Sequence, residues 1–172
     1  GCPATIYEAG DSLGGVVKHV IPGFRISDEA IAKDVALATA YGAEVKLNTR
    51  VESLEDLKKA GYDYIILATG ASKPGVLKLE AGEAMNALDF LAQFKATDGN
   101  LDLGENVVVI GGGNTAMDTA RAAKRNKGVK KVSLVYRRTK RYMPADAEEL
   151  EMAIADGVEF LELVAPVEQK DG

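Results

Sequence analysis

Hydrophobic residues fall into short continuous runs that alternate with longer segments in which apolar positions recur every three or four residues. The short runs predict strands at 4–8, 44–47, 62–70, 107–110, 132–136 and 158–163. The periodic segments predict helices at 27–42, 53–61, 84–95, 114–127 and 146–157. Strands that alternate with helices form parallel β-α-β units. The pattern therefore predicts an α/β protein with Rossmann-like, doubly wound parallel sheets.

Polar residues mark where several of these helices should begin. Ser27 and Ser53 each stand directly before a helical pattern, as N-cap residues do. Asp146 is followed three positions later by Glu149, the spacing of a capping box. We therefore expect the Asp146 side chain to cap the last helix.

The run 107–110 leads directly into a glycine-rich turn and then into a helical pattern. Gly111, Gly113 and Ala116 fill the three small positions of a G-x-G-x-x-G/A motif. Such residues permit a sharp turn, close approach of a diphosphate to the backbone, and close packing of the helix on the strand. N–H groups at the helix start would bind the phosphates. The alternative is an ordinary turn before a helix. The predicted cradle comprises Gly111, Gly112, Gly113, Asn114, Thr115 and Ala116.

Basic residues follow the next predicted strand, where an NAD site usually carries an acid for the ribose 2′-hydroxyl. Arg137 and Arg138 end that strand, Lys140 and Arg141 come next, and no carboxylate occurs between 119 and 145. Guanidinium groups can bind phosphate oxygens in pairs, so this segment favours the 2′-phosphate of NADPH. A solvated basic loop is the alternative.

Composition narrows the class of protein. The 172-residue chain can bury a substantial core, and its net charge of −5 gives no reason to expect nucleic acid or an anionic membrane as partner. Its apolar runs are too short to span a bilayer. Cys2 is the only cysteine, which excludes an internal disulfide, a C-x-x-C pair or a set of iron–sulfur ligands within this sequence. No signal peptide is visible, so we expect a cytoplasmic protein without a metal site.

The first half carries weaker signals of a second nucleotide site. Glu8 ends a short strand, where an acid commonly holds a ribose, although a surface acid is the alternative. Gly14 and Gly15 predict a flexible turn, where a ligand could approach the backbone closely. Ala68, Thr69 and Gly70 end the predicted strand 62–70 as a small-residue turn, or as a plain β-turn.

The chain begins directly before a strand and ends at 169–172 without a closing element. We therefore expect it to be a segment of a longer polypeptide.

Four motifs together identify a family resemblance. They are Ile21-Pro22-x-Phe24-Arg25, residues 111–118, residues 135–138 and residues 143–145. With them, essentially the whole chain resembles the NADPH:flavin reductase module of the glutamate synthase small-subunit family, which includes dihydropyrimidine dehydrogenase. Within that family the similarity is greatest to a subunit assigned to selenate reduction.

In that family an NADPH-binding domain is inserted into an FAD-binding domain. The resemblance implies a partial FAD-binding domain at 1–83 and an NAD(P)H-binding Rossmann domain at 84–172. It places the NADPH diphosphate at 112–116 and the 2′-phosphate at Arg137 and Arg138. It also implies an FAD site, in which Glu8 holds the ribose, Gly14, Gly15 and Arg25 line the path, Val51 meets the adenine, and Ala68, Thr69 and Gly70 lie near the cofactor. The family's first FAD glycine motif and closing flavin segment are absent from this sequence, which implies an incomplete FAD site and no activity for this segment alone.

The resemblance implies hydride transfer from NADPH to FAD, followed by electron transfer to an iron–sulfur domain or subunit, or to another acceptor. The cofactors carry that chemistry, so we assign no catalytic acid or base, and His19 is expected to have a surface or packing role. A nucleotide-binding or assembly module without turnover is the alternative. A one-domain dehydrogenase or methyltransferase would need substrate residues that we do not find in the sequence.

Overall fold

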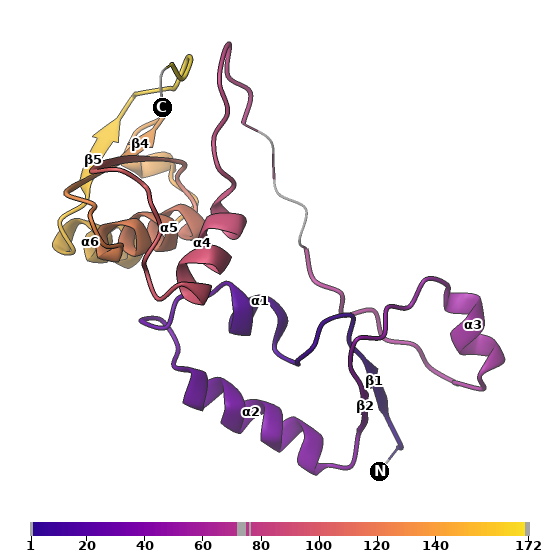
Figure 1. The fold of residues 1–172 in the computed structure, drawn as a ribbon. Coiled ribbons are helices and arrows are strands. Elements are labelled where there is room, and N and C mark those ends of the chain that lie inside the picture. Colours follow the sequence, from indigo (N-terminus) through magenta and orange to yellow (C-terminus); the bar gives the residue numbers. More distant parts are fainter. Residues whose placement is uncertain (1, 72–74, 76, 171–172) are drawn as a thin grey trace. The chain divides into compact units, whose positions relative to one another are not determined.

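The computed structural model describes residues 2–71, 75 and 77–170, and its chain forms two compact units (Figure 1). The first unit comprises Gly1–His19 and Gly23–Lys73, and the second comprises Val20–Pro22 and Pro74–Gly172. The predicted domain boundary at 83–84 lies within the second unit. The assignment of FAD to the first part and NADPH to the second stays a prediction.

The first unit is built on a parallel pair of strands, β1 (Thr5–Tyr7) and β2 (Glu44–Lys46), in which Ile6 lies opposite Val45. Its helices are α1 (Gly15–His19), α2 (Asp28–Ala40) and α3 (Leu54–Lys59). The predicted caps are confirmed: Ser27 accepts a hydrogen bond from the Ala30 N–H at 3.2 Å, and Ser53 accepts one from the Glu55 N–H at 3.2 Å. These bonds satisfy N–H groups that the first helical turn leaves without intrahelical partners.

The predicted strand at 62–70 is wrong, because the structure assigns no strand there. A strand requires a neighbouring strand for its backbone hydrogen bonds, and within the described residues none pairs with this segment. Its apolar side chains consequently remain in solvent, with Tyr64 at 90% and Ile66 at 89% exposure.

The second unit contains a three-stranded parallel sheet in the order β3 (Asn106–Ile110), β4 (Lys131–Tyr136) and β5 (Glu159–Glu162). Val109 lies opposite Leu134, which in turn lies opposite Phe160. The helices of this unit are α4 (Ala87–Ala96), α5 (Asn114–Arg125) and α6 (Ala147–Ala155), with a short 3-10 helix η1 (Lys140–Tyr142). Parallel strands joined by helices confirm the predicted α/β class with Rossmann-like sheets.

Helix α5 is the central element of this unit, since it contacts β3, β4, α4 and α6. Small residues allow this close packing: Ala120, Ala122 and Ala123 are completely buried. They lie with Met117 and Leu134 in the core. The burial fixes the helix axis against the sheet, so the amino end of α5 is held at the carboxyl end of β3.

An ion-pair cluster anchors the other end of α5. Asp156 accepts a hydrogen bond from Arg121 Nε at 2.6 Å, and from Arg125 Nη1 at 2.7 Å and Nη2 at 2.9 Å. Hydrogen bonding to Arg125 is the main cause that holds the pKa of Asp156 below its ordinary value, with Arg121 acting in the same direction and burial opposing both. The carboxyl end of α5 is thus tied to the end of α6, while its amino end faces the glycine turn.

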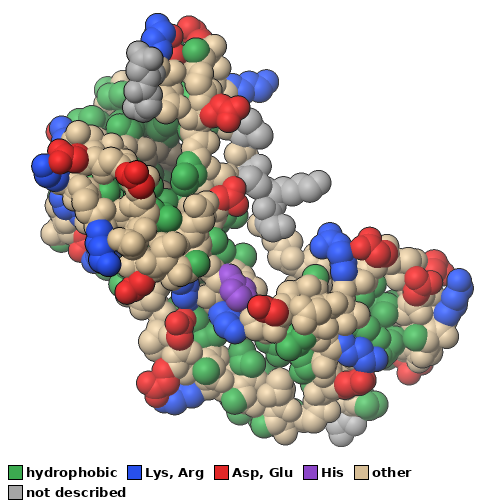
Figure 2. Space-filling model, in the orientation of Figure 1, with side chains coloured by type: hydrophobic (Ala, Val, Ile, Leu, Met, Phe, Trp, Pro, Cys, Tyr) green, Lys and Arg blue, Asp and Glu red, His purple; other side chains and the backbone are tan. Residues whose placement is uncertain are grey.

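Charged side chains of both signs are interspersed on the face shown in Figure 2, without a region of one sign. Among the described residues, no helix combines the length and hydropathy that a membrane span requires.

Candidate functional site

The glycine turn joins β3 to α5 through an unusual backbone conformation at Gly111. Its φ of +150° favours glycine, and its N–H donates to the Val135 carbonyl at 3.1 Å. A Cβ built at Gly111 would lie 3.1 Å from the Cβ of Ala116. Small residues at 111 and 116 therefore let the helix start close to the strand end, as the motif predicts.

Gly112 has a packing role that the sequence did not reveal. A Cβ at this buried position would overlap the ring of Tyr136, at 2.6 Å from Cδ2. The Tyr136 hydroxyl donates to the carbonyl of Tyr142 at 2.7 Å. Glycine at 112 thus allows an aromatic residue of the neighbouring strand to lie directly against the turn.

Gly113 differs from Gly111 and Gly112 because neither its φ value nor a contact with the described residues requires a glycine there. Its φ of −98° and ψ of 170° suit any residue, and apart from the adjoining residues no heavy atom of the described chain lies within 4 Å of a Cβ built on it. The side chain that this position lacks would project into open space at the start of α5. That is the geometry expected where a ligand, and not the protein, occupies the space beside the backbone.

The amino end of α5 is suited to an anion. Its first turn has no acidic residue and its N-cap, Gly113, provides no side-chain hydrogen bond. The Ala116 and Met117 N–H groups donate to the Gly113 carbonyl at 2.9 and 3.3 Å. In the described part of the chain no partner engages the N–H groups of Asn114 and Thr115. These two donors and the helix dipole can hold a phosphate.

The basic segment, residues 137–141, leaves the carboxyl end of β4. Arg137, Arg138 and Arg141 are exposed, and none forms an ion pair with a residue that the structure describes. Hydrogen bonds with β5 and its continuation hold this segment. Leu163 N–H donates to the Arg138 carbonyl at 3.4 Å, and Lys140 N–H donates to the Glu162 side-chain carboxylate.

The return segment, residues 142–146, brings the chain back to the glycine turn. Ala145 N–H donates to the Gly112 carbonyl at 3.0 Å. Asp146 N–H donates to Asn114 Oδ1 at 3.0 Å, and Asn114 Nδ2 donates to Asp146 Oδ2 at 3.1 Å. The return segment that follows the basic segment is therefore bonded directly to the glycine turn and to the first residue of α5.

The capping bond expected of Asp146 is wrong. Asp146 does occupy the N-cap position of α6, but its side chain makes no capping hydrogen bond. The carboxylate bonds instead to Asn114 of another helix. The capping-box pattern considers only neighbours along the chain, so it cannot predict that a residue distant in sequence will bind the carboxylate instead.

In the first unit, Glu8 follows β1 and its Oε1 accepts a hydrogen bond from the Gly10 N–H at 2.7 Å. Gly14 and Gly15 have positive φ values, and a Cβ at Gly14 would lie 2.8 Å from Lys18 Cβ. These two glycines therefore have a structural role, because they form the turn that leads into α1. Val51, like Ala68, Thr69 and Gly70, lies exposed outside helices and strands.

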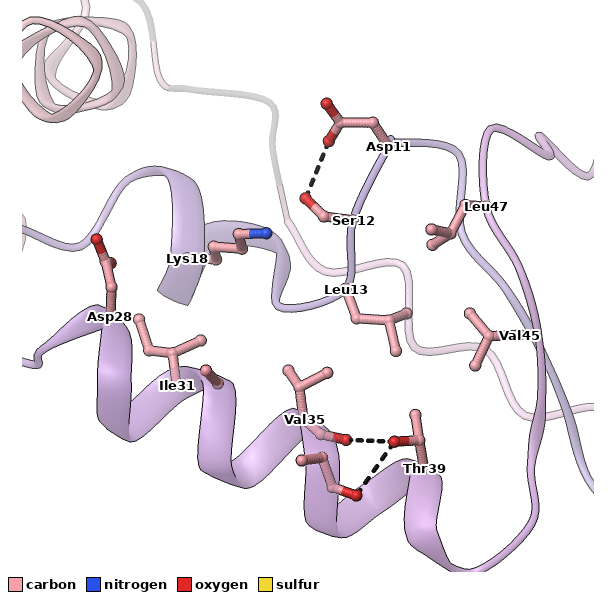
Figure 3. Close-up of a pocket in the computed structure, with 12 residues that line it drawn as sticks. Asp11, Ser12, Leu13, Lys18, Asp28, Ile31, Val35, Thr39, Val45 and Leu47 are labelled. Atoms are coloured by element: carbon pink, nitrogen blue, oxygen red, sulfur yellow. Dashed lines mark hydrogen bonds between the residues drawn. The ribbon is translucent and has the colours of Figure 1, made fainter.

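A cavity of about 480 Å³ lies in this unit beside α2 (Figure 3). Its lining is largely apolar and includes Ile31, Val35, Val45 and Leu47. A smaller cavity of about 350 Å³ lies beside it, and Gly14 is the one predicted FAD residue among the lining residues of the two. The other predicted FAD residues line neither cavity: Glu8, Gly15, Arg25, Val51, Ala68, Thr69 and Gly70. The structure thus does not gather the predicted FAD residues around either cavity.

Tyrosines form a cluster at β1 that the sequence analysis missed. The Tyr7 and Tyr62 hydroxyls lie 3.0 Å apart. Hydrogen bonds from Thr5 and then Tyr7 lower the pKa of Tyr62, whereas the bond to Tyr62 raises that of Tyr7.

No grouping of three or more His, Cys, Asp or Glu side chains suited to a metal ion occurs among the described residues.

Comparison with known proteins gives a family match over residues 16–170, to the model described as pyridine nucleotide-disulphide oxidoreductase. YgfK of Escherichia coli K12, named a putative oxidoreductase, is 44% identical over 93% of this chain and 16% of its own length. The glutamate synthase [NADPH] small chain of the same organism is 33% identical over 97% of this chain and 38% of its own length. The predicted resemblance to the glutamate synthase small-subunit family is confirmed, and this chain spans well under half of either relative.

A solved structure, Mycobacterium tuberculosis FprA in complex with NADPH, aligns with 99% of this chain and 54% of its own length. The TM-score is 0.74 at 18% sequence identity. That likeness establishes a shared fold.

Proposed function

Because the chain belongs to the pyridine nucleotide-disulphide oxidoreductase family, we propose that it is the NADPH-binding portion, and part of the FAD-binding portion, of a flavoprotein oxidoreductase. The family and the NADPH in the name of the glutamate synthase relative support both cofactors that the sequence predicts. One observation carries the assignment of the NADPH site: the open space beside Gly113, next to helix N–H groups without a partner in the described chain.

The cradle fits a diphosphate. An ordinary turn needs no glycine at a φ of −98°, whereas a phosphate oxygen resting on the backbone would collide with a side chain there. Asn114 and Thr115 offer backbone donors. The first turn of α5 itself has no acidic residue, and the nearby Asp146 carboxylate is bonded to the Asn114 side-chain amide. These features favour an anion over a simple structural turn.

The basic segment supplies the preference for NADPH over NADH. Arg137 and Arg138 lie at the carboxyl end of β4, directly beside the strand that leads into the cradle. Ligands of parallel sheets bind at this edge. Two exposed guanidinium groups there would pair with a 2′-phosphate, and a bare ribose hydroxyl would leave them without a partner.

Bound NADPH and FAD would together supply the hydride-transfer chemistry, with an iron–sulfur centre or another acceptor of a partner domain or subunit as the proposed destination of the electrons. In this proposal, the residues of this chain bind the two cofactors and orient them. Residues 111–116 fix the diphosphate, the arginines fix the adenosine end, and Glu8 at the end of β1 offers a carboxylate to the FAD ribose. No proton transfer is assigned to a side chain, because the transferred hydride needs none from the protein.

The experiment compares the dissociation constants of NADPH and NADH for the protein and for Arg137→Ala/Arg138→Ala. We expect the variant to bind NADPH about 100-fold more weakly, since it loses two charge-assisted contacts worth about 1.5 kcal/mol each. The NADH constant should change little.

Lys127→Ala/Lys130→Ala is the matched control. It removes the same charge at the amino end of β4, away from the proposed site. If both double variants weaken NADPH equally, or if Arg137→Ala/Arg138→Ala weakens NADH as much as NADPH, the assignment of the 2′-phosphate is wrong.

A further inference from the structure

We infer that the side chain of Tyr142 is the surface on which the adenine ring of the bound nucleotide stacks. This role rests on the proposed NADPH site and adds to it a contact for the base, beyond the contacts for the diphosphate and the 2′-phosphate. Tyr142 is the first residue of the return segment, directly after the basic segment, and it is 63% exposed.

The backbone of Tyr142 is held at two points. Its carbonyl accepts a hydrogen bond from the Tyr136 hydroxyl at 2.7 Å, and its N–H donates to the Thr139 carbonyl at 3.0 Å. Both bonds use backbone atoms of Tyr142, so neither engages its ring or its hydroxyl. The aromatic side chain therefore projects from a fixed backbone and stays available to a ligand.

Two connections join this backbone to the glycine turn. Tyr136, whose hydroxyl holds the Tyr142 carbonyl, also packs its ring directly against Gly112. Ala145, three residues after Tyr142, donates its N–H to the Gly112 carbonyl at 3.0 Å. Three residues span at most about 11 Å. Tyr142 thus lies close to the turn that is proposed to hold the diphosphate.

Tyr142 has the surface that a nucleobase requires. It is the one aromatic residue among the exposed large apolar side chains that the structure describes in the second unit. With the described residues, its ring forms no aromatic pair and its hydroxyl no hydrogen bond. A flat aromatic face stacks on any base, whereas the exposed aliphatic side chains of this unit offer no such face.

The position of Tyr142 along the chain suits the chemistry of the adenosine end. Arg137 and Arg138, the proposed contacts of the 2′-phosphate, directly follow β4, and Tyr142 ends the 3-10 helix η1 that comes next. In NADPH the adenine is attached to the ribose carbon adjacent to the one that carries the 2′-phosphate. A residue that contacts the base must therefore lie near the residues that bind this phosphate.

Dissociation constants of NADPH and NADH for Tyr142→Ala and Tyr142→Phe test this role. We expect Tyr142→Ala to weaken both nucleotides by the same factor, about tenfold, because both carry the adenine that loses its stacking surface. Tyr142→Phe keeps the aromatic face and should bind both as the unsubstituted protein does. Tyr41→Ala is the matched control, because Tyr41 is 86% exposed in the first unit, and it should also bind both normally.

Proton NMR of the bound nucleotide gives a readout that a purely structural effect of the substitution would not change. The ring current of a stacked tyrosine moves the adenine proton resonances upfield. At saturating NADPH, we expect this shift with the unsubstituted protein and with Tyr142→Phe, and a clearly smaller shift with Tyr142→Ala.

Several results would overturn the stacking role while leaving the NADPH site intact. These are unchanged constants for Tyr142→Ala, a loss confined to NADPH, an equal loss in Tyr142→Phe or Tyr41→Ala, and adenine resonances that do not depend on the ring. The selectivity of Arg137→Ala/Arg138→Ala tests the proposed function separately in each case. If the unsubstituted protein binds neither nucleotide, the proposed function and the stacking role both fail.

Discussion

Two runs that both predict strands have different structures in this molecule. Residues 107–110 form most of β3, where Val109 is 5% exposed, while residues 62–70 form no strand and leave Ile66 at 89%. β3 pairs with β4 along its length and α5 packs on it, whereas no described strand pairs with 62–70. Pairing with a neighbouring strand and packing against α5 thus distinguish β3 from residues 62–70.

The same contrast separates the two candidate sites. The predicted NADPH residues lie on a sheet, a turn and a helix that hydrogen bonds and burial hold together. The predicted FAD residues lie after the end of β1, at the start of α1 and on exposed segments outside helices and strands. Rigid elements hold functional groups more accurately than loops do, so the second unit gives the more specific account of binding.

The largest expected effect separates the two apolar runs directly. Leu134→Ala, at a fully buried position of β4, should cost about 2–5 kcal/mol in the free energy of unfolding because it leaves a cavity beside α5. Ile66→Ala should change that free energy by less than about 0.5 kcal/mol. Chemical denaturation of both variants measures the difference. A large loss for Ile66→Ala would mean that 62–70 is packed and that the contrast is wrong.

A smaller effect sharpens the contrast through pH. Asp156→Asn should lower the free energy of unfolding at neutral pH by about 1–2 kcal/mol, since Arg121 and Arg125 lose a charged acceptor. A depressed folded-state pKa contributes stability above the ordinary aspartate pKa, and this contribution disappears as the pH falls through the folded-state value. The two proteins should therefore converge in stability under acidic conditions.

Asp63→Asn removes the same charge from an exposed position of the first unit and is the control. Parallel stability curves for Asp156→Asn and the unsubstituted protein down to acid pH would show that the ion pairs are not the cause.

The sequence predicted the second unit better than the first for identifiable reasons. The strand, turn and helix from 106 to 125 depend on neighbours along the chain, and the helix begins at Asn114 as predicted. Long-range contacts account for the failures. The partner of 62–70 could not be judged from its own residues, and the bond from Asp146 to Asn114 joins two helices.

The candidate site shows the same division. The motif predicted small residues at 111 and 116. The structure explains them through the positive φ of Gly111 and the short distance from a Cβ built there to the Cβ of Ala116. It could not foresee that Gly112 accommodates Tyr136, because that requires the pairing of β3 with β4. The binding roles of the arginines and of the FAD residues stay predictions.

The most direct test of the central claim is the dissociation constant of NADPH for Gly113→Val, with Gly23→Val as control at another position where a Cβ meets open space. The account predicts that Gly113→Val weakens NADPH by about 100-fold or more while the free energy of unfolding changes by about 1 kcal/mol at most, the value of a poorer N-cap. Gly23→Val should bind NADPH normally. An unchanged NADPH constant for a folded Gly113→Val protein would contradict the claim that the diphosphate lies against this turn.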